Sequence, residues 1–208
     1  MAKLYFYYAS MNAGKSTTLL QADFNYRERG MATMLWTAAL DHRSDHHAIE
    51  SRIGLGADAH RYSPDTDLWD RVSAAHRVEP LACVLVDEAQ FLTEAQVWQL
   101  ARLADEAGIP VLCYGLRTDF QGELFPGTKR FLEVADERQE IQVEARCWCG
   151  ARATHNARLV DGEQVYDGEL KVVGNTIDLR DQPKLPVGPE VTYELLCRKH
   201  WVGGRVRA

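Results

Sequence analysis

The chain has 208 residues, of which 46% are hydrophobic and 26% are charged, and its formal net charge is −6. This balance is that of a globular protein with enough chain to bury a sizeable core. The negative charge argues against a general binder of nucleic acids or membranes, and the lack of any run of 18 apolar residues argues against a membrane-spanning helix.

The first half of the chain alternates apolar runs with a helical pattern. The run LYFYYA (4–9) predicts a buried strand, and a helix is expected from Lys15 to about Arg29, where Gly30 would end it. The run TMLWTA (33–38) predicts a second strand. A third is expected over 81–88, where four consecutive apolar residues precede two acids.

A second helix and a fourth strand follow. TEAQ (93–96) has the form of a capping box, and apolar residues continue from it at helical spacing until Gly108 and Pro110. PVLCYG (110–115) then predicts another apolar strand. Strands that are apolar throughout and alternate with helices indicate a mostly parallel sheet covered on both faces, which is an α/β fold.

The pattern changes after about residue 140. CWCG (147–150), a glycine-rich polar stretch and CRKH (197–200) follow, with few long apolar runs between them. We therefore predict two parts, a nucleotide-binding domain over 1–140 and a small satellite module over 141–208.

The cysteines and the N-terminus predict a cytoplasmic protein. Cys83 and Cys113 lie in apolar runs, as reduced core residues do, and the total of five is odd. Both features fit a reducing compartment. Lys3 leads directly into the first apolar run, which leaves no space for a secretory leader.

A phosphate-binding loop is predicted between the first strand and the first helix. Gly14 permits close approach of the backbone, Lys15 can neutralise the β- and γ-phosphates, and the Ser16 hydroxyl can bind Mg²⁺. Ala9 departs from the usual pattern, which begins with glycine, and an ordinary helix N-terminus is the alternative. The candidate loop residues are Ala9, Ser10, Met11, Asn12, Ala13, Gly14, Lys15 and Ser16.

Two acids follow the third strand, in VLVDEAQF (84–91). Ligands of open α/β sheets bind beyond the carboxyl ends of the strands, so Asp87 is placed to hold Mg²⁺ through its water shell. Glu88 is then available as a general base, because adjacent strand residues point in opposite directions. The alternative is two solvated acids that end a strand.

The motifs SMNAGKST, DHR with SRIGL, VLVDEAQFL, VLCYGLRTDF followed by GELF, the Cys-x-Cys pair and CRKH resemble, in this order, those of the type II thymidine kinases. The resemblance extends from about residue 3 to residue 200. It implies a P-loop (RecA-like) α/β fold with a C-terminal zinc-binding lasso module. It also implies transfer of the ATP γ-phosphate to thymidine with Mg²⁺, which yields dTMP for DNA synthesis. A homotetramer and feedback inhibition by dTTP are further implications.

The resemblance also implies roles for individual residues. Glu88 matches the carboxylate that takes the proton of the thymidine 5′-hydroxyl. Asp41 and Arg43 match a pair near the transferring phosphate, and they join the loop residues, Asp87 and Gln90 as candidates for ATP and Mg²⁺ binding. The residues that match the thymidine site are Met11, Phe91, Leu116, Phe120, Phe125, Val173, Gly174 and Tyr193. Without the resemblance, the aromatic residues in this set would be read as core.

One departure from the family pattern concerns the segment before Tyr193. In the family, a V-[IV]-G-G-[ND] element lies only a few residues before that tyrosine. Here VVGN (172–175) is followed by a 176–192 insertion, which reads as an exposed excursion. The resemblance nevertheless implies that Val173, Gly174 and Asn175 belong to the substrate loop.

A zinc site is predicted from four residues near the C-terminal end, namely Cys147, Cys149, Cys197 and His200. A Cys₃His set suits a closed tetrahedral structural site, and the resemblance implies one here. Reduced surface cysteines with a solvated histidine are the alternative. The group His42, His46 and His47 is read as a polar loop and not as a second metal site.

Two other functions fit parts of the sequence. An ATPase motor or switch would use Glu88 to activate water. A non-enzymatic zinc-knuckle protein would bind nucleic acid, which the negative net charge disfavours. We expect thymidine and ATP as partners, and no stable nucleic-acid or membrane partner.

Overall fold

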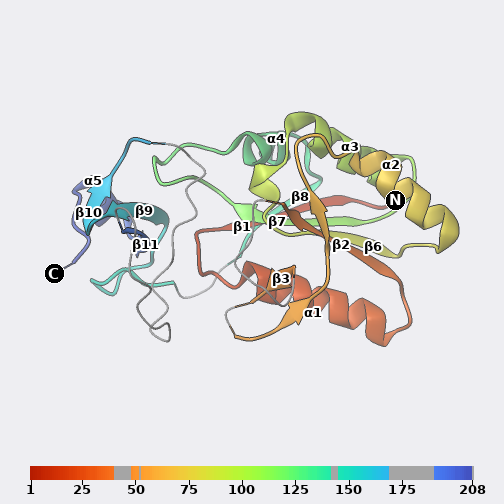
Figure 1. Cartoon of the computed structure of the whole chain (residues 1–208), viewed down its shortest axis with the longest axis horizontal. Coiled ribbons are helices and arrows are strands. Elements are labelled where there is room, and N and C mark those ends of the chain that lie inside the picture. The colour runs from red at the N-terminus through yellow and green to blue at the C-terminus, as the bar shows by residue number, and fades with distance from the viewer. Residues whose placement is uncertain (40–47, 52, 142–144, 169–189, 208) are drawn as a thin grey trace. The chain divides into compact units, whose positions relative to one another are not determined.

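The computed structural model describes residues 1–39, 48–51, 53–141, 145–168 and 190–207 (Figure 1). The chain forms two compact units. The first contains Met1–Ala9, Gly14–Arg117 and Phe125–Gln142, and the second contains Ser10–Ala13, Thr118–Leu124 and Val143–Ala208.

The first unit is built on a six-stranded sheet with the order β5-β2-β6-β7-β1-β8. Every neighbouring pair in this sheet is parallel. The strands are β1 (Leu4–Ala9), β2 (Thr33–Ala38), β5 (His60–Tyr62), β6 (Cys83–Val86), β7 (Val111–Leu116) and β8 (Glu137–Glu140). The expected parallel sheet and its four predicted strands are confirmed. The central strands are apolar because both faces of the sheet are covered.

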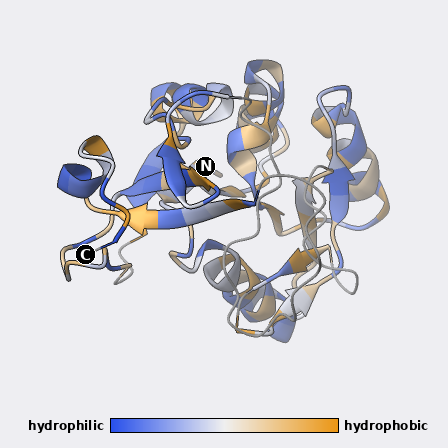
Figure 2. Ribbon diagram, turned by 60° about the vertical axis from the view of Figure 1, so that its left-hand side comes forward, coloured by the Kyte–Doolittle hydropathy of each residue, from blue (hydrophilic) through white to orange (hydrophobic). Residues whose placement is uncertain are grey.

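Helices cover both faces of this sheet (Figure 1). On one face, α1 packs its Leu19 and Leu20 with Leu35, Leu85 and Tyr114. On the other, α3 and α4 bury their apolar side chains against β1, β6 and β7, and α2 packs beside α3. The helices are α1 (Lys15–Glu28), α2 (Leu68–Val78), α3 (Glu94–Asp105) and α4 (Pro126–Val134). In Figure 2 apolar and polar residues share each helix, as expected of helices with one buried side.

The predicted helix boundaries are confirmed at two ends. Gly30 has a φ of 70° and donates its N–H to the Arg27 carbonyl at 2.9 Å, which closes the last turn of α1. At the start of α3, the Thr93 hydroxyl accepts the Gln96 N–H, and the Gln96 side chain accepts the Thr93 N–H. This reciprocal pair is the expected capping box.

The third strand is shorter than predicted. It ends at Val86, so Asp87 and Glu88 lie beyond it. Glu88 has a φ of 52°, in the left-handed region that non-glycine residues rarely adopt, and it precedes the short 3₁₀ helix η1 (Ala89–Phe91). The expectation that strand alternation separates the two acids is therefore wrong, because the strand ends before them and the backbone turns at Glu88. The Asp87 carboxylate meets Ser16, whereas the Glu88 carboxylate meets Gln90.

Strand β8 was not predicted, because its sequence ERQE has no apolar pattern. It pairs with β1 on one side only, and its first three residues are exposed. Charged residues are usual on such edge strands, where they discourage pairing with other chains. The first unit also contains a small antiparallel pair, β3 (Ile49–Glu50) with β4 (Gly56–Ala57).

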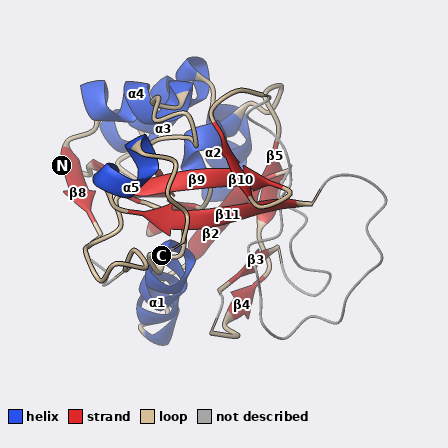
Figure 3. Cartoon of the chain, turned by 90° about the vertical axis from the view of Figure 1, so that its left-hand side faces the viewer, coloured by secondary structure: helices blue, strands red, loops and turns tan. Residues whose placement is uncertain are grey.

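The second unit contains a three-stranded antiparallel sheet in which β9 lies between β10 and β11 (Figure 3). Its elements are β9 (His155–Val160), β10 (Glu163–Val165), β11 (Val191–Leu196) and α5 (Arg198–Val202). Asp161 and Gly162, both with positive φ, form the tight turn between β9 and β10. The last residues of the predicted 176–192 excursion, 191 and 192, already belong to β11.

The cysteines of the main sheet are core residues, as predicted. Cys83 in β6 and Cys113 in β7 are free thiols and fully buried. Burial raises the pKa of Cys83 to about 12, so this thiol stays protonated at neutral pH. No helix among the described residues has the length and apolar character that crossing a bilayer requires.

Candidate active site and metal centre

The start of α1 has the features of an anion site. Gly14 occupies the N-cap with a φ of 73°, no side chain caps the helix, and its first turn contains no acid. The first N–H groups of a helix lack intrahelical partners and favour negative charge. Lys15 begins this helix and is only 8% exposed. A buried cation beside the N–H groups that open a helix is suited to hold phosphate oxygens.

Ser16 and Asp87 bring two oxygen ligands together at the carboxyl edge of the sheet. The Ser16 hydroxyl donates to one Asp87 carboxylate oxygen at 2.7 Å. This contact fits the predicted arrangement, in which the Ser16 oxygen would bind Mg²⁺ directly and Asp87 would hold the ion through its water shell. The other Asp87 oxygen accepts the Glu88 N–H at 2.9 Å. Asp87 is 2% exposed, which shields it from bulk water.

Glu88 is held by contacts to its backbone and to its side chain. Its carbonyl accepts the Tyr62 hydroxyl at 2.7 Å, and its carboxylate accepts the Gln90 side-chain amide at 2.5 Å. Glu88 is 8% exposed. A buried carboxylate in a disfavoured backbone conformation is a feature that points to function.

Three of the predicted thymidine-site residues belong to the first unit. Phe91 and Phe125 pack edge to face, with ring centroids 5.6 Å apart. Leu116 lies at the end of β7, where its carbonyl accepts the Thr128 hydroxyl at 2.7 Å. Phe91 follows β6, Leu116 ends β7, and Phe125 immediately precedes α4. They therefore share the carboxyl end of the sheet with Asp87 and Glu88.

Ala9 ends β1 in the first unit, and the second unit contains the remaining described candidates. Ser10, Met11, Asn12 and Ala13 belong to it, and Asn12 has a positive φ of 57°. The Met11 N–H donates to the Asn156 side-chain oxygen at 2.9 Å. The Asn156 amide nitrogen donates to the Thr118 carbonyl at 3.1 Å. A single buried asparagine thus ties the phosphate-loop segment to residues 118–124.

Phe120 and Tyr193 both neighbour Arg158. The Arg158 guanidinium lies 4.9 Å from the Phe120 ring centroid, and Tyr193 is opposite Arg158 in the β9–β11 ladder. Burial raises the pKa of Tyr193, and the Arg158 charge partly offsets this effect. Phe120 is 3% exposed, so the alternative reading of this aromatic as core describes its burial equally well.

Several predicted residues lie outside the described ranges, namely Asp41, Arg43, Val173, Gly174, Asn175 and the histidines 42, 46 and 47. Tyr62 and Asn156 were missed because their partners are distant in sequence. Local patterns offered no indication of either residue. The Asp161-Gly162 turn was missed as well, although an Asp-Gly pair is readable from sequence alone as a hairpin turn.

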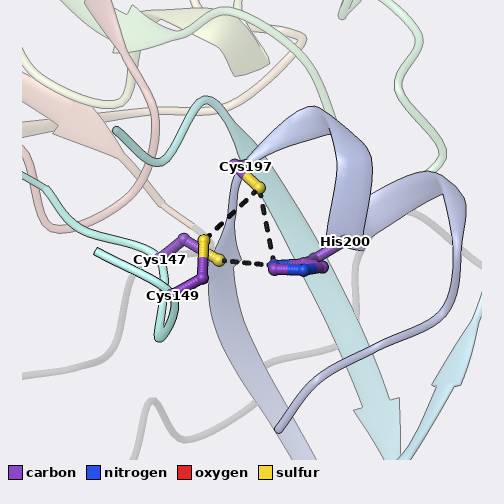
Figure 4. A group of neighbouring side chains, drawn as sticks. All are labelled: Cys147, Cys149, Cys197 and His200. Atoms are coloured by element: carbon purple, nitrogen blue, oxygen red, sulfur yellow. Dashed lines mark hydrogen bonds between the residues drawn. The ribbon is translucent and has the colours of Figure 1, made fainter. Parts of the chain in front are cut away.

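The four predicted zinc ligands converge in the second unit (Figure 4). The Cys149 and Cys197 sulfurs are 4.0 Å apart, and the Cys147 and Cys197 sulfurs lie 3.3 Å and 3.6 Å from His200 Nδ1. Tetrahedral zinc places ligand sulfurs about 3.8 Å from one another and sulfur about 3.5 Å from nitrogen. The donor atoms therefore fit a closed zinc site without an open position for substrate.

The electrostatics of the cluster favour a bound cation. Burial opposes ionisation of Cys147, but hydrogen bonds from the Cys149 and Cys197 backbone and from His200 outweigh it and lower its pKa to about 6. The Ala151 backbone lowers the pKa of Cys149, but burial and the neighbouring Cys147 and Cys197 outweigh this and raise it. Several thiolates can coexist here only if a cation neutralises them.

Loss of the metal is expected to loosen the second unit and spare the main sheet. The cluster lies beside a very small core made of Cys147, Ala157 and Leu196. Cys149→Ser should abolish stoichiometric zinc binding, change the fluorescence of Trp148, which stacks on His200 at 4.1 Å, and raise the thymidine KM. Far-ultraviolet circular dichroism should still show the helices of the first unit.

The matched control is Cys83→Ala, which removes a thiol far from the cluster in sequence and should leave the zinc content unchanged. Elemental analysis of the wild-type protein checks the premise. A preparation without zinc that retained native fluorescence would refute the metal assignment.

Comparison with known proteins finds thymidine kinases by family model and by sequence identity. The thymidine kinase family model matches residues 2–201. A thymidine kinase of Novosphingobium aromaticivorans is 63% identical over 97% of both chains. Those of Zymomonas mobilis and Agrobacterium fabrum are 52% and 50% identical, each over 97% of both chains.

Proposed function

Because this chain belongs to the thymidine kinase family, we propose that it transfers the γ-phosphate of ATP to the 5′-hydroxyl of thymidine, giving dTMP. The observation that supports this most directly is the cluster of Ser16, Asp87 and Glu88 at the carboxyl edge of the parallel sheet. Phosphoryl transfer needs phosphate positioning, a metal ligand set and a group that accepts the proton of the nucleophile. Neighbouring residues at the start of α1 and after β6 offer a candidate for each of these three requirements.

Each part of the reaction is assigned to different residues. The N–H groups at the start of α1 and the Lys15 ammonium bind phosphate oxygens and offset their charge. Ser16 and Asp87 would hold Mg²⁺, which neutralises charge on the β- and γ-phosphates. Glu88 accepts the proton of the 5′-hydroxyl. The aromatic pair Phe91 and Phe125 contributes apolar surface for the nucleoside.

The remaining assignments belong to the same proposal. Met11, Leu116, Phe120, Val173, Gly174 and Tyr193 would contact the nucleoside. Asp41 and Arg43 would act near the transferring phosphate, and residues 9–13 would bind ATP. We further propose a structural zinc ion, a division into domains 1–140 and 141–208, a cytoplasmic location, a homotetramer and inhibition by dTTP.

A single assay tests the proposed reaction. ATP consumption is measured with thymidine, deoxycytidine, deoxyadenosine or deoxyguanosine, and the nucleotide products are separated by chromatography. Formation of dTMP in step with ATP loss is expected. ATP hydrolysis that needs no nucleoside would favour the ATPase alternative. If no nucleoside supports turnover, a DNA titration at several salt concentrations follows, and binding with a steep salt dependence would favour the zinc-knuckle alternative.

A further inference from the structure

Gln90 is a buried glutamine two residues after the proposed base. It lies in η1 and is 1% exposed. Its side-chain nitrogen donates to the Glu88 carboxylate at 2.5 Å, and its side-chain oxygen accepts the Leu116 N–H at 3.0 Å. Both ends of the Gln90 amide are therefore engaged by groups of the first unit.

The Leu116 contact fixes the direction of the Gln90 amide. A backbone N–H can only donate, so the oxygen of Gln90 must face Leu116 and the amide nitrogen must face Glu88. The amide nitrogen can only donate in turn, so the Glu88 oxygen that it meets must be an acceptor. A flipped amide would place two donors together at Leu116 and two acceptors together at Glu88.

Two glycines, Gly115 and Gly127, pack closely against Gln90. A Cβ on Gly115 would lie 3.0 Å from the Gln90 backbone nitrogen and 3.1 Å from its side-chain oxygen. A Cβ on Gly127 would lie 2.9 Å from the Gln90 carbonyl oxygen. Glycines in β7 and α4 thus allow η1 to pack closely enough for Gln90 to span from Leu116 to Glu88.

We propose that Gln90 is a positioning residue that holds the Glu88 carboxylate in its reactive orientation. This inference rests on the proposed kinase function. It also reassigns Gln90, because an amide engaged at both ends is better suited to orient Glu88 than to bind ATP or Mg²⁺ directly. Asp87 and Tyr62 fix the Glu88 backbone, and Gln90 fixes its side chain.

Gln90→Met tests this role, because methionine has a similar volume and cannot donate a hydrogen bond. A misplaced catalytic group can cost about 10²-fold in rate, so kcat should fall by about 10–10²-fold. The KM values for ATP and thymidine should change little. A fall in kcat without a rise in either KM separates misorientation of Glu88 from a loss of substrate binding.

Gln96→Met is the matched control. Gln96 is a glutamine of similar burial, 2% exposed, and its amide nitrogen donates to the Ser63 and Thr66 carbonyls in the same unit. Gln90→Met and Gln96→Met should both lose thermal stability, but Gln96→Met should keep the wild-type kcat. Equal losses of kcat in the two variants would show that Gln90 has only a structural role.

Gln90→Glu keeps the test decisive if the methionine variant fails to fold. It preserves the shape of the side chain but replaces the amide donor that faces Glu88 with a carboxyl oxygen, so kcat should fall while the KM values for ATP and thymidine change little. A wild-type kcat in this variant would overturn the inference. A wild-type protein that makes no dTMP would instead refute the proposed function, so the two failures are distinguishable.

Discussion

Replacing Glu88 with glutamine is expected to lower kcat by about 10²–10⁴-fold, the usual contribution of general-base catalysis. The 5′-hydroxyl is a weak nucleophile, and its proton must leave as the new P–O bond forms. A carboxylate can accept that proton, whereas a carboxamide of nearly the same shape cannot. The loss corresponds to about 3–5 kcal/mol of barrier, and it should lie toward the lower end because phosphoryl transfer is largely dissociative.

Binding measurements separate this chemical effect from a loss of substrate. Isothermal titration with thymidine and with a non-hydrolysable ATP analogue should give nearly wild-type affinities for Glu88→Gln. Glu106→Gln, which alters an exposed pair with Arg102, is the control and should leave kcat unchanged. Asp87→Asn should behave differently, because it should raise the Mg²⁺ concentration needed for activity. If Glu88→Gln keeps more than about a third of wild-type kcat when chemistry limits the rate, another group is the base.

Lys15→Met is expected to lower kcat/KM for ATP by at least about 10²–10³-fold, the cost of removing one preorganised electrostatic group from an active site. The ammonium group neutralises phosphate charge at the start of α1, where its burial limits screening by water. Methionine retains most of the aliphatic stem, so the packing at 8% exposure is largely preserved. The melting temperature should therefore stay near that of the wild type.

Lys129→Met is the matched control for this variant. Lys129 is an exposed lysine on α4, so its replacement removes the same charge from the surface and should leave turnover unchanged. Activity and thermal unfolding are measured on the same preparations. Unchanged turnover in a folded Lys15→Met protein would refute the phosphate-loop assignment.

Much of the first unit was predictable because its elements leave a local trace in the sequence. Strands buried on both faces are apolar throughout, which identified 4–9, 33–38 and 110–115. The capping box at Thr93 and the terminating Gly30 depend on residues within one helical turn, so their spacing is readable directly. Strand β8 leaves no such trace, because it forms by pairing with β1 and exposes charged side chains to water.

The chemical types at the site could be read from the sequence: a lysine and a serine opening a helix, two acids following a strand, and a Cys₃His ligand set. Which of these groups meet depends on the tertiary structure. Ser16 and Asp87 are 71 positions apart, Cys147 and His200 are 53 apart, and Gln90 and Leu116 are 26 apart. The left-handed turn at Glu88 is a further example, because its strain is balanced by contacts to Tyr62 and Gln90. Sequence periodicity shows which side of each segment faces the core and which faces solvent. The distances between side chains depend instead on the order in which strands from remote segments pair in one sheet.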